Sequence, residues 1–146
     1  TCRLADGSVA ALLLATRQVA EARLAEVAKV TRDFLAENAQ LEEVDEAALR
    51  ARVRRGEVTL LDVRPPEEYA AGHIPGALSV PLPELARQLA RLPKRQEVVA
   101  YCRGPYCVMA IEAVRQLRAK GFKAVRLEEG VLDWAALGHA VARGRA

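Results

Sequence analysis

The chain has 146 residues, of which 51% are hydrophobic and 28% are charged, and its net charge is +3. These proportions are those of a globular protein and exclude a disordered or fibrous chain. The longest apolar stretch near the N-terminus, residues 9–15, is far shorter than the ~20 residues of a membrane-spanning helix, and no signal-peptide cleavage pattern follows it. We therefore expect a cytoplasmic protein without a membrane partner.

The charges are unevenly distributed along the chain. Residues 1–50 carry 6 Lys/Arg against 9 Asp/Glu, whereas residues 51–146 carry 16 against 10. The excess of positive charge in residues 51–146 favours small anionic substrates or acidic partners over nucleic acid, because the sequence shows no basic stripe with interleaved aromatic residues. The three cysteines do not suggest a disulfide framework. Two loop cysteines with the scattered His73 and His139 do not make a zinc site, so we expect neither metal nor cofactor.

The N-terminal segment has the pattern of one long amphipathic helix. From Asp6, which can serve as N-cap, to about Glu37, it contains no proline and no glycine after Gly7. A helix of this length cannot bury its apolar stripe on itself. Four apolar residues fall seven apart, which predicts a homodimer through residues 6–37. They are Leu13, Ala20, Val27 and Phe34. Polar residues between them exclude a regular coiled coil, and we expect a dimerisation segment at 1–40 before a second domain at 41–146.

After residue 45 short helices and strands alternate. The pattern predicts helices over 45–55, 66–71, 83–92, 108–120 and 131–137, and strands over 58–63, 77–80, 98–101 and 124–127. Short apolar strands between helices indicate an α/β fold with a mostly parallel central sheet covered on both faces. Ligands of such sheets bind at the carboxyl ends of the strands.

Cys102 lies at one of these carboxyl ends, between the strand over 98–101 and the helix that begins near Val108. The first N–H groups of a helix lack helical partners, and the positive end of its dipole lies beside them. A cysteine there, next to a cation such as Arg103, can have its pKa lowered from ~8.5 to between about 3.5 and 7.5. The pattern therefore predicts that Cys102 is a nucleophile.

Five segments of the second domain form an ordered set. They are Leu61-Asp62-Val63-Arg64, Glu67-Glu68-Tyr69, Gly72-His73-Ile74-Pro75-Gly76-Ala77, Tyr101-Cys102-Arg103, and Gly130 with Trp134 and Gly138. Together they resemble a single rhodanese domain, a sulfurtransferase, over about residues 45–142. The resemblance implies the three-layer rhodanese fold. It also implies that Cys102 takes sulfur from a small sulfur-containing anion or a persulfide donor and passes it to a thiol acceptor or to cyanide.

The same resemblance suggests roles for neighbouring residues. It implies a substrate-binding loop made of Arg103, Gly104, Pro105, Tyr106, Cys107 and Val108. Structural support would come from Asp62, Arg64, Glu68 and His73. We interpret His73 as a turn residue and not as a general base, because a thiolate that is already ionised needs no base.

The loop departs from the family at its end. Family loops commonly hold six residues and often end in arginine, but here the sixth residue is Cys107, which leaves Arg103 as the loop cation. A doubly anionic donor such as thiosulfate would then meet one guanidinium and not two, which argues against thiosulfate as the natural donor. The related phosphatases and arsenate reductases place an arginine where this chain has Val108, so we rank that chemistry low.

Cys107 has two interpretations. It opens the helix that follows the loop, so its thiol also lies in the field of a helix N-terminus and can act as a resolving thiol for Cys102. Such a bond requires Cα atoms within about 7 Å and thiols that point together. In the other interpretation Cys107 is only a small residue that the loop tolerates.

The first 40 residues resemble, more faintly, the end of an ArsR-type winged-helix transcription regulator, whose last helix pairs subunits. The resemblance rests on Arg3-Leu4-Ala5-Asp6 followed by a long helix. It implies a regulator–rhodanese fusion that contacts DNA only through a missing N-terminal domain. Two functions therefore stand: a sulfurtransferase that turns over, and a regulatory domain that senses sulfur species or oxidants through Cys102.

Overall fold

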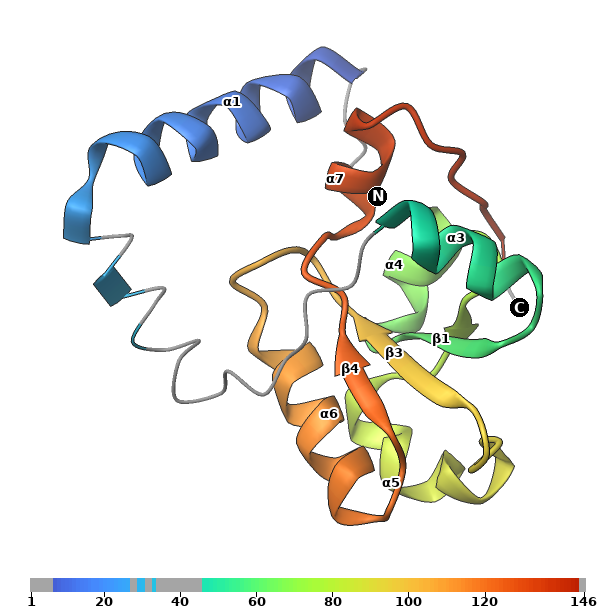
Figure 1. Ribbon diagram of the computed structural model, residues 1–146. Helices are drawn as coiled ribbons and strands as arrows, with labels where there is room; N and C mark the ends of the chain where they lie inside the picture. Colours follow the sequence, from blue (N-terminus) through green and yellow to red (C-terminus); the bar gives the residue numbers. More distant parts are fainter. Residues whose placement is uncertain (1–6, 27–28, 31–32, 34–45, 145–146) are drawn as a thin grey trace. The chain divides into compact units, whose positions relative to one another are not determined.

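The computed structural model describes residues 7–26, 29–30, 33 and 46–144, which are coloured in Figure 1. The chain divides into two compact units, Thr1–Gln40 and Leu41–Ala146. We describe each unit by itself.

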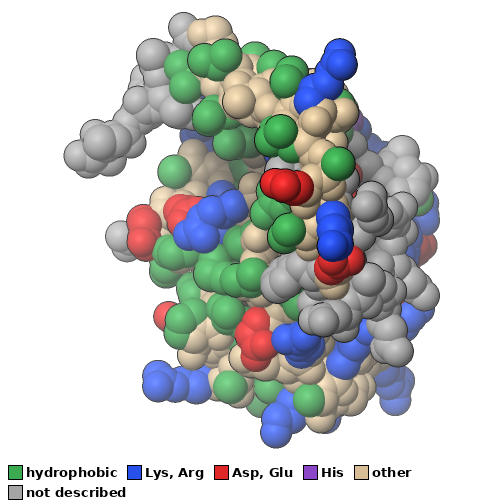
Figure 2. All heavy atoms as spheres, turned by 90° about the vertical axis from the view of Figure 1, so that its left-hand side faces the viewer, with side chains coloured by type: hydrophobic (Ala, Val, Ile, Leu, Met, Phe, Trp, Pro, Cys, Tyr) green, Lys and Arg blue, Asp and Glu red, His purple; other side chains and the backbone are tan. Residues whose placement is uncertain are grey.

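The first unit contains helix α1, Gly7–Arg23, and none of the residues of this helix is buried. Figure 2 shows apolar side chains at the surface of α1 next to charged ones, and Leu12, Leu13 and Val19 are all more than half exposed. The long N-terminal helix expected from the sequence is confirmed over Gly7–Arg23. Its expected extent over 6–37 without a break is wrong, because Leu24 is not helical. Because none of its residues is buried, α1 relies on local interactions such as the ion pair of Arg17 with Glu21, whereas most helical stability in proteins comes from tertiary packing. Val27 and Phe34 of the expected dimer seam lie outside the described residues.

The second unit is built on a parallel sheet of four strands in the order β2-β1-β3-β4. The strands are β1 Val58–Asp62, β2 Leu78–Ser79, β3 Glu97–Tyr101 and β4 Ala124–Arg126. The helices are α3 Glu46–Arg54, α4 Pro66–Ala71, α5 Leu85–Gln88, α6 Val108–Ala119 and α7 Val131–Ala136. Strands β1 and β3 are buried along their whole length, as expected for the centre of a parallel sheet.

The sheet separates two apolar clusters, which makes a three-layer domain. Side chains alternate along β3, so Val98 and Ala100 pack with α5 and α6, while Val99 and Tyr101 pack with α3, α4 and α7. Figure 1 shows these helices on the two faces of the sheet. The α/β fold expected from the sequence is thereby confirmed.

The single helix expected over 83–92 is wrong. The segment consists of a 3₁₀ turn at Leu82–Glu84, helix α5, and a second 3₁₀ turn at Leu89–Arg91. Four leucines of this segment pack on the same cluster, and they are Leu82, Leu85, Leu89 and Leu92. Their spacing of three, four and three residues matches 3₁₀, α and 3₁₀ turns, because a 3₁₀ helix returns to the same face after three residues.

Candidate active site

The candidate site is the loop that joins β3 to α6. Its first residue, Cys102, is 1% exposed, and its last residue, Cys107, is half-buried and occupies the N-cap position of α6. Within the loop, Gly104 has a φ of 137°, which side chains strongly disfavour. The N–H of Cys107 donates to the carbonyl of Gly104 at 3.1 Å, which closes a tight turn between the two cysteines.

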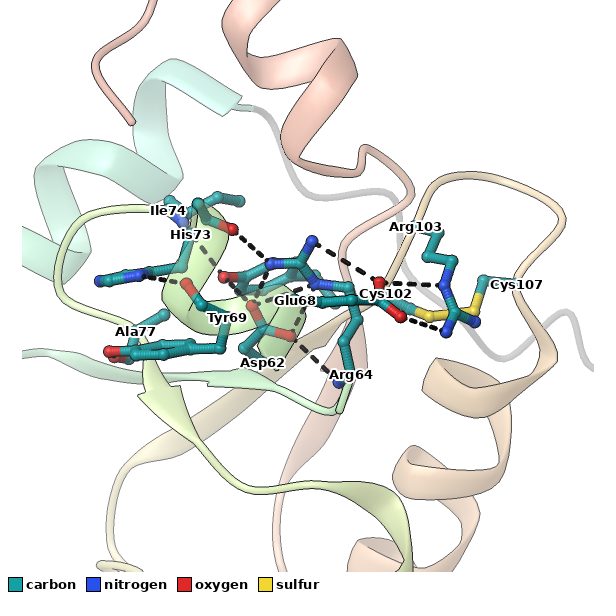
Figure 3. Close-up of polar contacts among 12 residues, drawn as sticks. Asp62, Arg64, Glu68, Tyr69, His73, Ile74, Ala77, Cys102, Arg103 and Cys107 are labelled. Atoms are coloured by element: carbon teal, nitrogen blue, oxygen red, sulfur yellow. Dashed lines mark hydrogen bonds and ion pairs between the residues drawn. A yellow bond between two sulfur atoms is a disulfide. The ribbon is translucent and has the colours of Figure 1, made fainter. Parts of the chain in front are cut away.

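The two cysteines form a disulfide, with their Cα atoms 6.1 Å apart (Figure 3). The structure therefore has the geometry that a resolving thiol requires, with the two Cα atoms within about 7 Å and the two sulfur atoms pointing together. The disulfide identifies Cys107 as a redox partner within reach of Cys102. Its role toward a persulfide stays a prediction.

Arg103 shares its charge with a carboxylate from α4. The Nε of Arg103 donates to Oε2 of Glu68 at 3.0 Å, and its Nη2 pairs with Oε1 (Figure 3). The hydrogen bond to Glu68 is the main cause of a raised pKa of Arg103. Glu68 also lies 4.0 Å from Nη1 of Arg64. Arg103, the expected loop cation, is thus half exposed, but Glu68 already neutralises its charge. This pairing weakens the electrostatic attraction of Arg103 for a doubly charged donor.

Asp62, at the end of β1, is the centre of a buried hydrogen-bond network. Arg64 donates to it from Nε at 2.9 Å and from Nη2 at 2.6 Å, and the Tyr101 hydroxyl donates at 2.7 Å. Nη2 of Arg64 also donates to the carbonyl of Gly72, and the N–H of Ile74 donates to the Tyr101 hydroxyl. The network ties the ends of β1 and β3 to the turn after α4, which is the place where sequence reasoning put structural support.

Burial and Asp62 set the ionisation of this network. Burial, and then the nearby Asp62 carboxylate, raise the pKa of Tyr101 far above its usual range, so the phenol stays protonated and donates. Burial opposes the charge of Arg64, but the hydrogen bonds and attraction of Asp62 outweigh it and raise the pKa of this guanidinium. The network therefore keeps the Arg64 guanidinium paired with Asp62 and keeps the Tyr101 hydroxyl as a hydrogen-bond donor.

His73 is turned away from the reactive loop. Its Nδ1 donates to the carbonyl of Tyr69 at 2.9 Å, its ring stacks on the Tyr69 ring at 3.7 Å, and its backbone pairs with Ala142. Figure 3 shows His73 on the opposite side of the Asp62 network from the two cysteines. This geometry fits a turn residue.

Two residues near the loop were not assigned to the site by sequence reasoning. Arg126 of β4 is 6% exposed, and its Nη1 donates to the carbonyl of Pro105 at 2.7 Å. Arg126 follows Ala124 by two positions and pairs with Ala100, so it lies on the sheet face that carries Cys102. Burial lowers its pKa. The signal that could have identified it is a charged residue inside the otherwise apolar strand predicted over 124–127.

Gly130 packs directly against the loop. A Cβ atom at this position would lie 2.4 Å from the carbonyl carbon and oxygen of Arg103, so no side chain fits. Its N–H donates to Oδ2 of the buried Asp133, which fixes the start of α7. Tyr106 and Val108, by contrast, are about half exposed and border the loop on its solvent side. Gly130 thus contacts the backbone of the loop at Arg103, whereas the side of the loop with Tyr106 and Val108 faces solvent.

Within the described residues, no group of three or more His, Cys, Asp or Glu side chains is placed to hold a metal ion. No helix in the same part of the chain is long and apolar enough to cross a membrane.

The fold and the site define a class of protein: a three-layer α/β domain with a buried cysteine at the carboxyl end of a central strand. The rhodanese-like domain family matches residues 45–137, and the chain belongs to that family. The crystal structure of the BH2092 protein from Bacillus halodurans superimposes with a TM-score of 0.65 at 28% identity, covering 79% of this chain and 85% of that one.

Two relatives extend the comparison beyond the fold. The chain is 46% identical over 142 residues to the HTH-type transcriptional regulator Rv0324 of Mycobacterium tuberculosis, a match that covers 97% of this chain and 62% of the regulator. It is 34% identical over 95 residues to a sulfurtransferase of Allochromatium vinosum, covering 64% of this chain and 87% of that protein. The first similarity covers nearly the whole chain and so includes the N-terminal unit, whereas the second covers about two thirds of the chain.

Proposed function

We propose that the protein is a sulfurtransferase that forms a persulfide on Cys102 and passes the sulfane sulfur to a thiol or to cyanide. The observation that carries the proposal is the placement of Cys102, buried at the end of β3 and beside the N-terminus of α6, in a domain of the rhodanese-like family. The sulfurtransferase relative supports it. The helix N-terminus favours the thiolate, and it favours an anionic persulfide for the same reason.

The reaction starts from the reduced loop. After a thiol has opened the Cys102–Cys107 disulfide, the Cys102 thiolate attacks the outer sulfur of the donor and forms an S–S bond. The bond between that sulfur and the rest of the donor breaks, and its electron pair leaves with the donor remnant. Because Glu68 already neutralises Arg103, we propose that a singly charged persulfide is a better donor than thiosulfate.

The test is Cys102→Ser. The variant is expected to lose cyanide- and thiol-dependent sulfur release to the background of the uncatalysed reaction, because serine forms no persulfide. Intact-mass measurement after incubation with glutathione persulfide gives the direct readout: the unsubstituted protein gains sulfur that cyanide removes. Retained activity in Cys102→Ser would place the chemistry on another residue.

A second candidate function is regulatory. The similarity to a transcriptional regulator over nearly the whole chain favours a sulfur- or redox-sensing part of an ArsR-type protein, paired through residues 6–37 and joined to a DNA-binding domain. The disulfide in the reactive loop is a change of state that such a sensor needs. Mass measurement after polysulfide or peroxide treatment separates the candidates: an enzyme returns to its starting mass when cyanide is added, whereas a sensor accumulates a stable product.

A further inference from the structure

The reactive loop contains two cysteines, although persulfide transfer needs only one. Cys102 alone forms and donates the persulfide in the proposed reaction, and Cys107 has no part in it. Yet the Cα atoms of the two residues lie 6.1 Å apart, inside the ~4.4–6.8 Å range of ordinary disulfides. The Cys107 sulfur therefore reaches the Cys102 sulfur in the folded loop.

The surroundings of Cys107 favour its reaction with Cys102 over the reaction of an external thiol. Cys102 is 1% exposed, so a thiol from solvent has little access to its Sγ atom, the atom that must be attacked to release sulfide. Cys107 approaches from within the loop, held by the turn that its N–H makes with Gly104. An intramolecular thiol has a high effective concentration, and its position at the N-terminus of the 12-residue helix α6 favours the thiolate.

We propose that Cys107 gives this domain a second activity, the reductive release of sulfide from sulfane sulfur. The inference rests on the proposed persulfide at Cys102. The Cys107 thiolate attacks Sγ of the Cys102 persulfide and forms the Sγ–Sγ bond. The bond from Cys102 Sγ to the outer sulfur breaks, and the outer sulfur takes the electron pair and one proton from water and leaves as HS⁻. The two cysteines are oxidised by two electrons, and the sulfane sulfur is reduced by two.

The disulfide in this structure is then the product state of that step. A dithiol reductant reopens it by two thiol–disulfide exchanges and leaves as its own disulfide. One complete cycle therefore consumes one sulfane sulfur and one dithiol and yields sulfide. The substrate class is a persulfide or polysulfide, and the co-reactant class is a dithiol, whereas a transferase in the strict sense hands the sulfur on without reducing it.

The experiment is a single turnover without reductant. The full chain is reduced, freed of reductant, and given an excess of thiosulfate labelled with ³⁴S at the outer sulfur. The excess offsets its weaker fit to the loop, and thiosulfate is chosen because its leaving group is sulfite, so any labelled sulfide must come from the second step. The unsubstituted chain is expected to release about one equivalent of labelled sulfide and to finish as the Cys102–Cys107 disulfide. Cys107→Ser and Cys107→Ala are expected to keep the labelled sulfur in cyanide-removable form and to release at least about tenfold less sulfide. Cys2→Ser is the matched control and should behave as the unsubstituted chain.

The outcomes separate this inference from the proposed function. Equal sulfide release by the unsubstituted chain and Cys107→Ser, with cyanide-removable sulfur on both, overturns the inference and leaves the transferase standing. Labelled sulfur mapped to Cys107 also overturns it, because attack on the outer sulfur moves the persulfide without reduction. If neither chain gains sulfur from thiosulfate or from glutathione persulfide, the proposed function fails and the inference fails with it.

Discussion

The two units of this chain contain apolar residues in similar abundance but use them differently. In α1, Leu12, Leu13 and Val19 are more than half exposed, and no residue of the helix is buried. In the rhodanese-like unit, strands β1 and β3 are buried throughout, and apolar clusters fill both faces of the sheet. Helical spacing of apolar residues therefore does not by itself show where they are buried: α6 buries its apolar face within its own unit, whereas α1 leaves its apolar residues exposed.

The largest expected effect follows from breaking the network at the end of β1. Asp62→Ala leaves the buried Arg64 guanidinium without its carboxylate, and we expect it to lower the free energy of unfolding by about 3–5 kcal/mol. Urea denaturation followed by circular dichroism measures the change. The matched control is Glu57→Ala, which removes an exposed carboxylate paired with Arg55 and should cost less than about 1 kcal/mol. Equal losses would show that the Asp62 network does not stabilise the domain.

Gly130→Ala tests the contact between α7 and the reactive loop. Its Cβ would lie 2.4 Å from the Arg103 carbonyl, so the loop or α7 has to move, and we expect a loss of about 1–3 kcal/mol with altered alkylation kinetics at Cys102. Gly7→Ala is the control, because nothing lies within 4 Å of its added methyl group and no loss is expected. Unchanged stability and unchanged alkylation in Gly130→Ala would contradict the close packing.

Arg126 is expected to affect reactivity more than stability. In Arg126→Met the loop loses both a hydrogen bond to Pro105 and a buried positive charge, and we expect the reduced chain to react about threefold to tenfold more slowly with iodoacetamide at pH 7. The pH at which alkylation reaches half its maximum should rise, because a nearby cation favours the thiolate. Arg126→Lys keeps the charge and should keep that pH midpoint. A shift shared by both variants would assign the effect to loop geometry and not to charge.

The smallest effect on stability is expected in the first unit. Leu13→Glu should change the unfolding of the rhodanese-like unit by no more than about 0.5 kcal/mol, because Leu13 is exposed on α1. Its effect should appear in association: light scattering is expected to show a dimer for the unsubstituted chain and a monomer for the variant. Leu12→Glu places the same charge one residue away from the seven-residue seam and should remain dimeric. If light scattering shows a monomer for the unsubstituted chain, the predicted dimer through residues 6–37 is wrong.

The sequence predicted the order of the elements and the position of Cys102, because both follow from local signals. Strand composition before Cys102 and helical spacing after it depend on neighbours in the chain. The 3₁₀ turns around α5 were missed because they arise from tertiary packing. The four leucines of this segment pack on an apolar cluster that residues of other helices and strands form, and the local sequence does not show that cluster. The hydrogen bond from Arg126 to Pro105 and the contact of Gly130 with Arg103 join residues far apart in sequence, and no local pattern reports such distances.

The strand order β2-β1-β3-β4 has a consequence for where chemistry can occur. After β1 the chain runs through α4 toward the edge strand β2, and after β3 it runs through α6, on the opposite face, toward the edge strand β4. The sheet therefore has a topological switch point between β1 and β3, the place where doubly wound folds bind their ligands. The ion pair between Glu68 of α4 and Arg103 of the loop crosses this switch point, so a donor that approaches Cys102 there meets a carboxylate and a guanidinium, one from each diverging connection.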